Sequence, residues 1–222
     1  MGGTRLLEAF MNRLVFLPLL SGACLEYNPG STVPGYGIAN PRPLEEQTQS
    51  DRLVQVTIPT VDILWVIDNS CSMGPEQTSL ADNSPIFLNY FLGSGLDYHI
   101  GTVSTDMFNA AESGKLVDAG GGLLWLEPDT LEPEPKFRNL IELGNGGGWP
   151  EKGLDAAYVA LEERGDGYNS GFERDMSGLH LIAISDEYDH SEQVAPEEFS
   201  DWLLNRRPLG GVSFSSISPL GS

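Results

Sequence analysis

The sequence predicts an α/β fold in which a doubly wound, mostly parallel sheet is flanked by helices. Segments 61–67 and 179–184 are nearly unbroken apolar runs, and such runs are typical of strands buried on both faces of a parallel sheet. Between them, apolar residues recur at helical spacing, as at Leu154, Tyr158 and Leu161. Strands that alternate with helices indicate a parallel sheet covered by helices on both faces.

Five strands are expected in this part of the chain. They are the two apolar runs, residues 98–103, a short edge strand at 123–126 and a last strand at 212–217. The edge strand is expected to be short because glycines precede it and Pro128 follows it.

Prolines mark the expected helix starts, because proline suits the first helical position. Helices are expected to begin at Pro75, Pro150 and Pro196. Pro85 is expected to kink or split the first of them, since a proline inside a helix removes a backbone hydrogen bond. The acidic, proline-rich stretch around Glu132 is expected to be an exposed, rigid loop.

The formal net charge of −20 at pH 7 argues against two classes of partner. Nucleic acids bind basic surfaces because their phosphates are anionic, and anionic lipid headgroups repel an acidic protein for the same reason. The glycine clusters lack the Gly-Lys-Ser/Thr ending of a phosphate loop, so no nucleotide is expected. Excess carboxylate favours divalent cations instead.

The first 57 residues are expected to direct and tether the protein. Residues 1–23 combine arginines, a short apolar run and small residues, the pattern of a signal peptide. Small residues directly before Cys24 resemble the lipobox of bacterial lipoproteins, in which that cysteine is acylated. Residues 24–57 are then a Pro/Gly-rich linker and residues 58–222 the folded domain. The alternative is ordinary cleavage after Ala23, which leaves a soluble secreted or periplasmic protein.

Oxygen-bearing side chains follow two of the predicted strands. Asp68, Ser70 and Ser72 come directly after the strand at 61–67, and Asp186 follows the strand at 179–184. Ligands of open parallel sheets bind outside the carboxyl ends of the strands, and oxygen is the ligand type that Mg²⁺, Mn²⁺ and Ca²⁺ require. The same pattern also suits a simple strand-to-helix turn, because Asp and Ser are good caps.

This constellation resembles the von Willebrand factor type A domain and its metal-ion-dependent adhesion site. Asp68, Ser70 and Ser72 match the Asp-x-Ser-x-Ser motif of that family, and Asp186 matches its second aspartate. The resemblance covers roughly residues 60 to 217. It implies a doubly wound, Rossmann-like fold that holds a divalent cation, Mg²⁺ or else Mn²⁺ or Ca²⁺, with an open position for an acidic residue of a protein partner.

The sequence departs from the family in two places. Gly148 stands where the family supplies a threonine ligand, so Thr105, Asp106 or Glu151 is expected to substitute for it. The family also continues with a further helix, strand and helix after the strand at 212–217, so a C-terminally truncated domain is one interpretation.

The resemblance favours a binding module over an enzyme. The expected function is adhesion at the bacterial cell envelope, with the membrane reached only through the lipid anchor at Cys24 and a protein ligand gripped through the cation. One alternative is a Mg²⁺-dependent phosphoester hydrolase that uses Asp68 and Asp186. Another is a degenerate, truncated domain without an active site.

Overall fold

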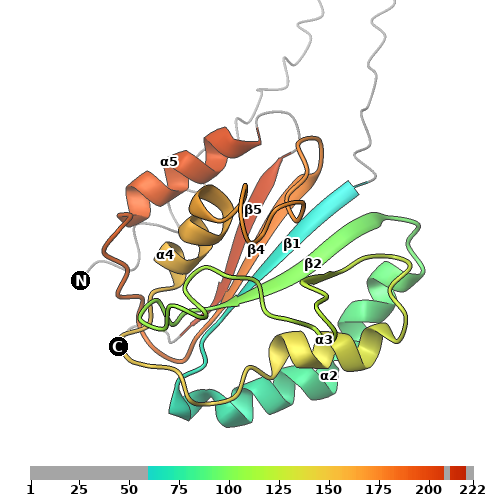
Figure 1. The fold of residues 1–222 in the computed structure, drawn as a ribbon, viewed down its shortest axis with the longest axis horizontal. Helices are drawn as coiled ribbons and strands as arrows, with labels where there is room; N and C mark the ends of the chain where they lie inside the picture. The colour runs from blue at the N-terminus through green and yellow to red at the C-terminus, as the bar shows by residue number, and fades with distance from the viewer. Residues whose placement is uncertain (1–59, 208–210, 219–222) are drawn as a thin grey trace, which may run out of the picture. The chain divides into compact units, whose positions relative to one another are not determined.

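A five-stranded sheet in the order β3-β2-β1-β4-β5 forms the centre of the computed structural model, which describes residues 60–207 and 211–218 (Figure 1). The strands are β1 (Thr60–Ile67), β2 (Asp97–Ser104), β3 (Trp125–Leu126), β4 (Gly178–Ile184) and β5 (Val212–Ile217). All neighbouring pairs are parallel except β2 and β3, which are antiparallel. The predicted mostly parallel sheet is confirmed.

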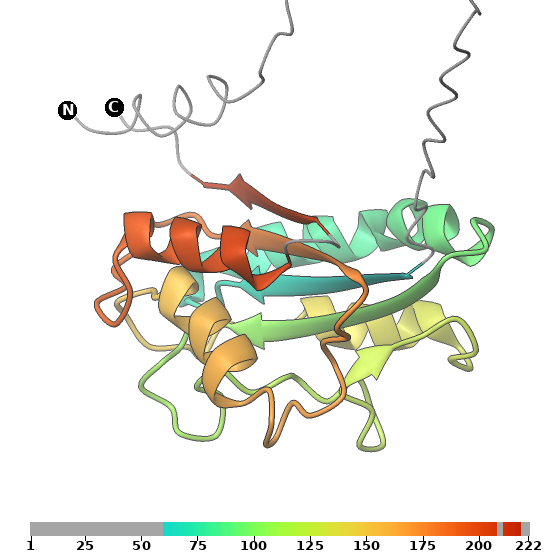
Figure 2. The ribbon, with the colours of Figure 1, turned by 90° about the horizontal axis from the view of Figure 1, so that it is seen from above.

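Helices cover both faces of this sheet (Figure 2). They are α2 (Gly74–Leu92), α3 (Pro133–Ile141), α4 (Gly153–Tyr158) and α5 (Pro196–Arg206), with a short 3-10 turn at Cys71–Met73 and a π turn at Val159–Glu163. Within the described ranges, none of these helices has both the length and the apolar character needed to cross a membrane. The signal peptide, Cys24 and the linker predicted for residues 1–57 lie outside the described residues.

Strand β1 is the centre of two apolar cores because its side chains alternate between the faces of the sheet. Ile63 and Trp65 pack on the face that carries α2 and α3. Leu64 and Val66 pack on the face that carries α4 and α5. Burying each such side chain contributes about 1.5–3 kcal/mol, which explains why β1 is an apolar run interrupted only by Asp62 between Val61 and Ile67.

Helices α2 and α3 show packing that local sequence does not reveal. Pro85 lies inside α2 and does not split it. The helix continues to Leu92, because its Ala81 and Leu88 are buried against the sheet and this packing outweighs one lost hydrogen bond. Helix α3 replaces much of the expected acidic loop. Its Phe137 is fully buried and stacks on Phe87 at 5.2 Å between ring centres.

Helix α4 begins at Gly153 rather than at Pro150. Its first amides are capped by a carboxylate from another loop, since Asp189 Oδ1 accepts hydrogen bonds from Gly153 N at 2.6 Å and Leu154 N at 3.2 Å. The preceding residues 142–152 are therefore free to run as a loop toward the carboxyl ends of the strands.

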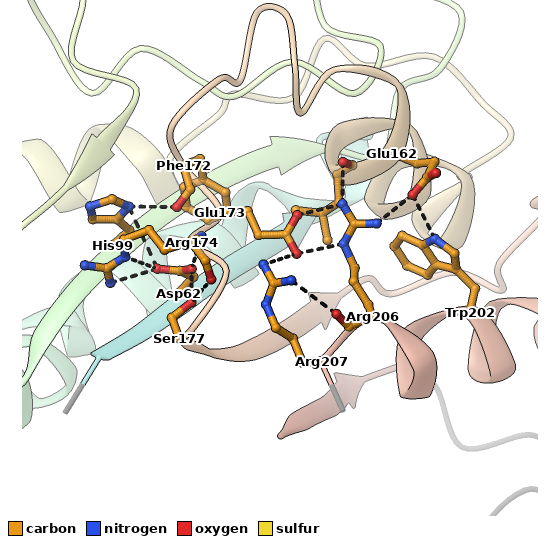
Figure 3. Close-up of polar contacts among 11 residues, drawn as sticks. Asp62, His99, Glu162, Phe172, Glu173, Arg174, Ser177, Trp202, Arg206 and Arg207 are labelled. Carbon is orange, nitrogen blue, oxygen red and sulfur yellow. Dashed lines mark hydrogen bonds and ion pairs between the residues drawn. The ribbon is translucent and has the colours of Figure 1, made fainter. Parts of the chain in front are cut away.

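Paired charges lie at the opposite side of the sheet, near the amino-terminal ends of the parallel strands (Figure 3). The fully buried Asp62 of β1 accepts hydrogen bonds from Arg174 N at 2.7 Å, from Arg174 Nε at 2.8 Å and from Ser177 Oγ. Close by, Glu173 pairs with both Arg206 and Arg207 at 2.6 Å. These bonds fix the segment that precedes β4 to the sheet and to the end of α5.

Candidate metal centre

The topology places a switch point between β1 and β4. The chain leaves β1 for α2 on one face of the sheet and leaves β4 for α5 on the other face. In open α/β sheets the crevice at such a point, outside the carboxyl ends of the strands, is the usual place for a ligand. Asp68 follows β1 and Asp186 follows β4 at this point.

Direct hydrogen bonds connect the four predicted ligands. Asp68 Oδ1 accepts a bond from Ser70 N at 2.7 Å, and the Ser70 and Ser72 hydroxyls lie 3.1 Å apart. Ser72 Oγ in turn donates to Asp186 Oδ1 at 3.1 Å. Asp68 is fully buried, whereas Ser72 and Asp186 face the solvent. The cluster therefore opens outward from a buried carboxylate.

Ser185 joins this cluster, although it was not among the predicted ligands. Its hydroxyl donates to Asp68 Oδ2 at 2.6 Å, so both oxygens of Asp68 have partners. The position of Ser185, at the end of β4 and directly before Asp186, was a signal that could have identified it.

Thr105 and Glu151 form a buried pair beside Asp68. The two residues are 2% and 1% exposed, and Thr105 Oγ1 donates to Glu151 Oε2. Glu151 Oε1 has no hydrogen-bond partner among the described residues. The pKa of Glu151 is raised to about 7, mainly by burial; the hydrogen bond from Thr105 opposes this shift, and the negative charges of Asp68 and Glu187 add to it.

Asp106, the third predicted substitute, has a different task. Its Oδ1 accepts hydrogen bonds from Phe108 N at 2.9 Å and Asn109 N at 3.0 Å, and its Oδ2 accepts one from Gly148 N at 3.0 Å. Asp106 thus ties two loops together through their backbone. Of the three predicted substitutes, Thr105 and Glu151 are the better placed to provide a ligand.

The loop before α4 is held tightly against the cluster. Gln77 of α2 donates from Nε2 to the carbonyl oxygens of Asp68 at 2.9 Å and Gly144 at 3.0 Å. Gly147 N donates to the Asn69 carbonyl oxygen at 2.8 Å. A methyl group on Gly147 would overlap the Asn69 side-chain oxygen, so only glycine allows this close approach.

These residues fit a hard divalent cation on grounds of charge. Among the described residues, no Lys, Arg or His forms an ion pair with Asp68, Glu151 or Asp186. Buried carboxylates without a countercharge are costly, and a cation bound by oxygen ligands would relieve that cost. In the described part of the chain, no three His, Cys, Asp or Glu side chains form a metal cluster by themselves. A cation held here would therefore need serine and threonine hydroxyls among its ligands.

Comparisons with known proteins add no argument to the fold and geometry described above. The sequence matches no protein-family model and no curated protein. Among solved structures, proximal thread matrix protein 1 from the mussel byssus is similar at 14% sequence identity and a TM-score of 0.40, over 72% of this chain and 35% of that one. The chain thus spans about a third of that protein. A likeness of this degree carries no functional argument.

Cys71 lies in the middle of the motif loop. In the structure Cys71 is free and exposed, between Ser70 and Ser72. The 3-10 turn at Cys71–Met73 buries Met73 instead, which turns the thiol toward solvent.

Proposed function

We propose that this domain is a binding module that holds a divalent cation and uses it to engage an acidic residue of a protein partner. The observation that carries the proposal is the hydrogen-bonded chain from Asp68 through Ser70 and Ser72 to Asp186 at the switch point of the sheet. Mg²⁺ is the expected cation, with Mn²⁺ or Ca²⁺ as alternatives, since all three prefer oxygen ligands.

Each residue has a distinct role in this proposal. Asp68, held by Ser70 N and Ser185 Oγ, offers a buried carboxylate whose position is constrained by its own hydrogen bonds. Ser70, Ser72 and Asp186 extend the oxygen cluster to the solvent. Thr105 and Glu151 replace the missing threonine of the resembled family.

A bound cation would supply an open coordination position for a carboxylate. That property suits a chain with a formal net charge of −20, because an acidic surface otherwise repels an acidic partner. We propose that the domain works at the bacterial cell envelope, anchored through a lipid on Cys24. This location rests on the sequence pattern of residues 1–24 alone.

Calorimetric titration of the full chain with Mn²⁺ and Mg²⁺ tests the proposal. We expect saturable binding by the wild type and loss of binding in Asp68→Ala. Asp68→Asn serves as the matched variant, because it removes the charge but keeps the size and hydrogen bonding of the side chain: its amide oxygen can accept from Ser70 N, and its amide NH2 can donate to the Ser185 hydroxyl. It should fold as the wild type does and still fail to bind the metal.

The same samples separate a binding module from an enzyme. Metal binding without turnover of generic phosphoesters supports the module, whereas metal-dependent turnover that Asp68→Asn abolishes supports the hydrolase. A wild-type protein that binds neither cation would rule out both.

A further inference from the structure

Three large aromatic side chains are exposed on the loops that carry the candidate metal centre. Phe108 is 63% exposed on the loop after β2, Trp149 is 69% exposed on the loop before α4, and Tyr188 is 60% exposed on the loop after β4. Exposed aromatic residues beside a polar cluster mark interaction surfaces, where Trp and Tyr are over-represented among the residues that dominate binding. We call Phe108, Trp149 and Tyr188 the aromatic rim.

The backbone of the rim is anchored at Asp106. Its carboxylate accepts hydrogen bonds from Phe108 N at 2.9 Å and from Gly148 N, next to Trp149, at 3.0 Å. The Lys152 ammonium lies 5.2 Å from the centre of the Phe108 ring, which holds that ring from one side. Asp106 immediately follows Thr105, so the anchor of the rim adjoins the buried Thr105–Glu151 pair.

Trp149 connects the rim to the loop after β4. Its ring packs edge-to-face on His190, with 5.5 Å between ring centres, and His190 N donates to the Glu151 carbonyl oxygen at 2.7 Å. Tyr188 lies on the same short loop, between Asp186 and His190. The loops are thus fixed before any partner arrives, which lowers the entropy lost on binding.

The charges around the rim indicate what else the partner carries. Glu187, Asp189 and Glu192 lie on the loop of Tyr188, and the nearby Lys152 is already paired with Glu192 at 2.8 Å. An approaching protein therefore meets negative charge beside Tyr188, and basic residues in that protein would be complementary to it.

We propose that the aromatic rim selects partners in which the acidic residue is flanked by apolar side chains, with basic residues beyond them. The proposal rests on the function proposed above and adds the partner's local sequence to it. Apolar side chains packed on Phe108, Trp149 and Tyr188 exclude water from the carboxylate at the centre, and exclusion of water strengthens a contact between charges.

Fluorescent, terminally blocked pentapeptides test this inference by anisotropy on the full chain in Mn²⁺. Lys-Phe-Asp-Phe-Lys is expected to bind about tenfold more tightly than Lys-Gly-Asp-Gly-Lys, a difference of about 1.4 kcal/mol. Lys-Phe-Asn-Phe-Lys should bind as weakly as either peptide does in EDTA. Phe108→Ala, Trp149→Ala and Tyr188→Ala should each reduce the preference for phenylalanine while the affinity for Mn²⁺ itself stays unchanged.

Tyr90→Ala is the matched control, because Tyr90 is an equally exposed aromatic residue, at 71%, that lies on α2 instead of the rim loops. It should leave every affinity unchanged. Equal affinity for the phenylalanine and glycine peptides, or no peptide binding at all by the Mn²⁺-loaded protein, would overturn the inference and leave the metal site standing. Absence of Mn²⁺ binding in calorimetry would instead overturn the proposed function.

Discussion

Glu151 and Asp62 are both almost completely buried carboxylates, yet their surroundings differ. Asp62 accepts hydrogen bonds from Arg174 and Ser177 and is neutralised by the guanidinium. Glu151 accepts one bond from Thr105, leaves its other oxygen without a partner among the described residues and has Asp68 as a neighbouring charge. A raised pKa together with an unpaired oxygen is typical of functional positions.

Glu151→Gln tests this role at the scale of one residue. We expect the affinity for Mn²⁺ to fall about tenfold, because metal ligands of this kind must be charged. The folded pKa of about 7 lies above the ordinary value of 4.5, so the ionised carboxyl destabilises the metal-free fold as the pH rises through that interval. Glutamine removes that charge and should raise the metal-free stability at pH 8 while leaving it unchanged at pH 4.

Urea unfolding in EDTA at the two pH values, beside Mn²⁺ calorimetry, measures both effects. Thr105, Asp68 and Glu187 are the groups that face Glu151. Glu187→Gln is the control, because it removes the repulsion between the Glu187 and Glu151 carboxylates and keeps the Glu151 side chain. An unchanged Mn²⁺ affinity in Glu151→Gln would show that Glu151 is no ligand.

At the scale of elements, local pattern predicted the strands better than the helices. The predicted strands at 61–67, 179–184 and 212–217 agree closely with β1, β4 and β5. For β1 and β4 the reason is that nearly unbroken apolar runs reflect burial from both faces. Helix α3 was not predicted, because prolines and acidic residues dominate the start of this segment and suggest a loop. The helix forms because Phe137, Leu140 and Ile141 are buried. The start of α4 depends on Asp189, which lies 36 residues away.

The loop before α4 gives a test at this scale. Gly147→Ala places a methyl group against the Asn69 side chain and 2.8 Å from the Asn69 carbonyl oxygen, and such overpacking costs about 1–3 kcal/mol. Because Asn69 lies between Asp68 and Ser70, we also expect weaker Mn²⁺ binding. Gly146→Ala is the matched control, since its methyl group meets no atom within 4 Å. Equal unfolding midpoints and equal Mn²⁺ affinities for the two variants would contradict the close packing of Gly147 against Asn69 beside the metal centre.

Across the whole molecule, the two edges of the sheet use carboxylates for different purposes. At the amino-terminal edge, Asp62 and Glu173 are paired with arginines (Figure 3). At the carboxyl edge, Asp68, Glu151 and Asp186 have hydroxyl and amide partners and no paired cation among the described residues. The arginine-paired carboxylates hold segments of the fold together, whereas the carboxylates without a paired cation leave negative charge available for a ligand.

Asp62→Ala separates these purposes. Removing Asp62 leaves the Arg174 and Ser177 donors without their buried acceptor, although Arg174 keeps its pair with Asp97 at 2.8 Å. We expect the free energy of unfolding to fall by about 3 kcal/mol. The affinity of the folded protein for Mn²⁺ should change by less than about twofold, because distant sites act independently. Chemical denaturation and calorimetry measure the two quantities. Glu142→Ala, which removes an exposed pair with Arg138, should alter neither. A loss of Mn²⁺ binding in Asp62→Ala would show that the edges are coupled.

The sequence by itself determined the parallel sheet and the cluster of Asp68, Ser70, Ser72 and Asp186. Strand burial and the spacing of a strand-end motif are local properties, and parallel strands bring their carboxyl ends to one edge. Only the tertiary structure joined Thr105 to Glu151, across 46 positions of the chain, assigned Asp106 to the loops and gathered the aromatic rim. Loop packing decides which distant side chains meet and which lose water, and no local pattern encodes that.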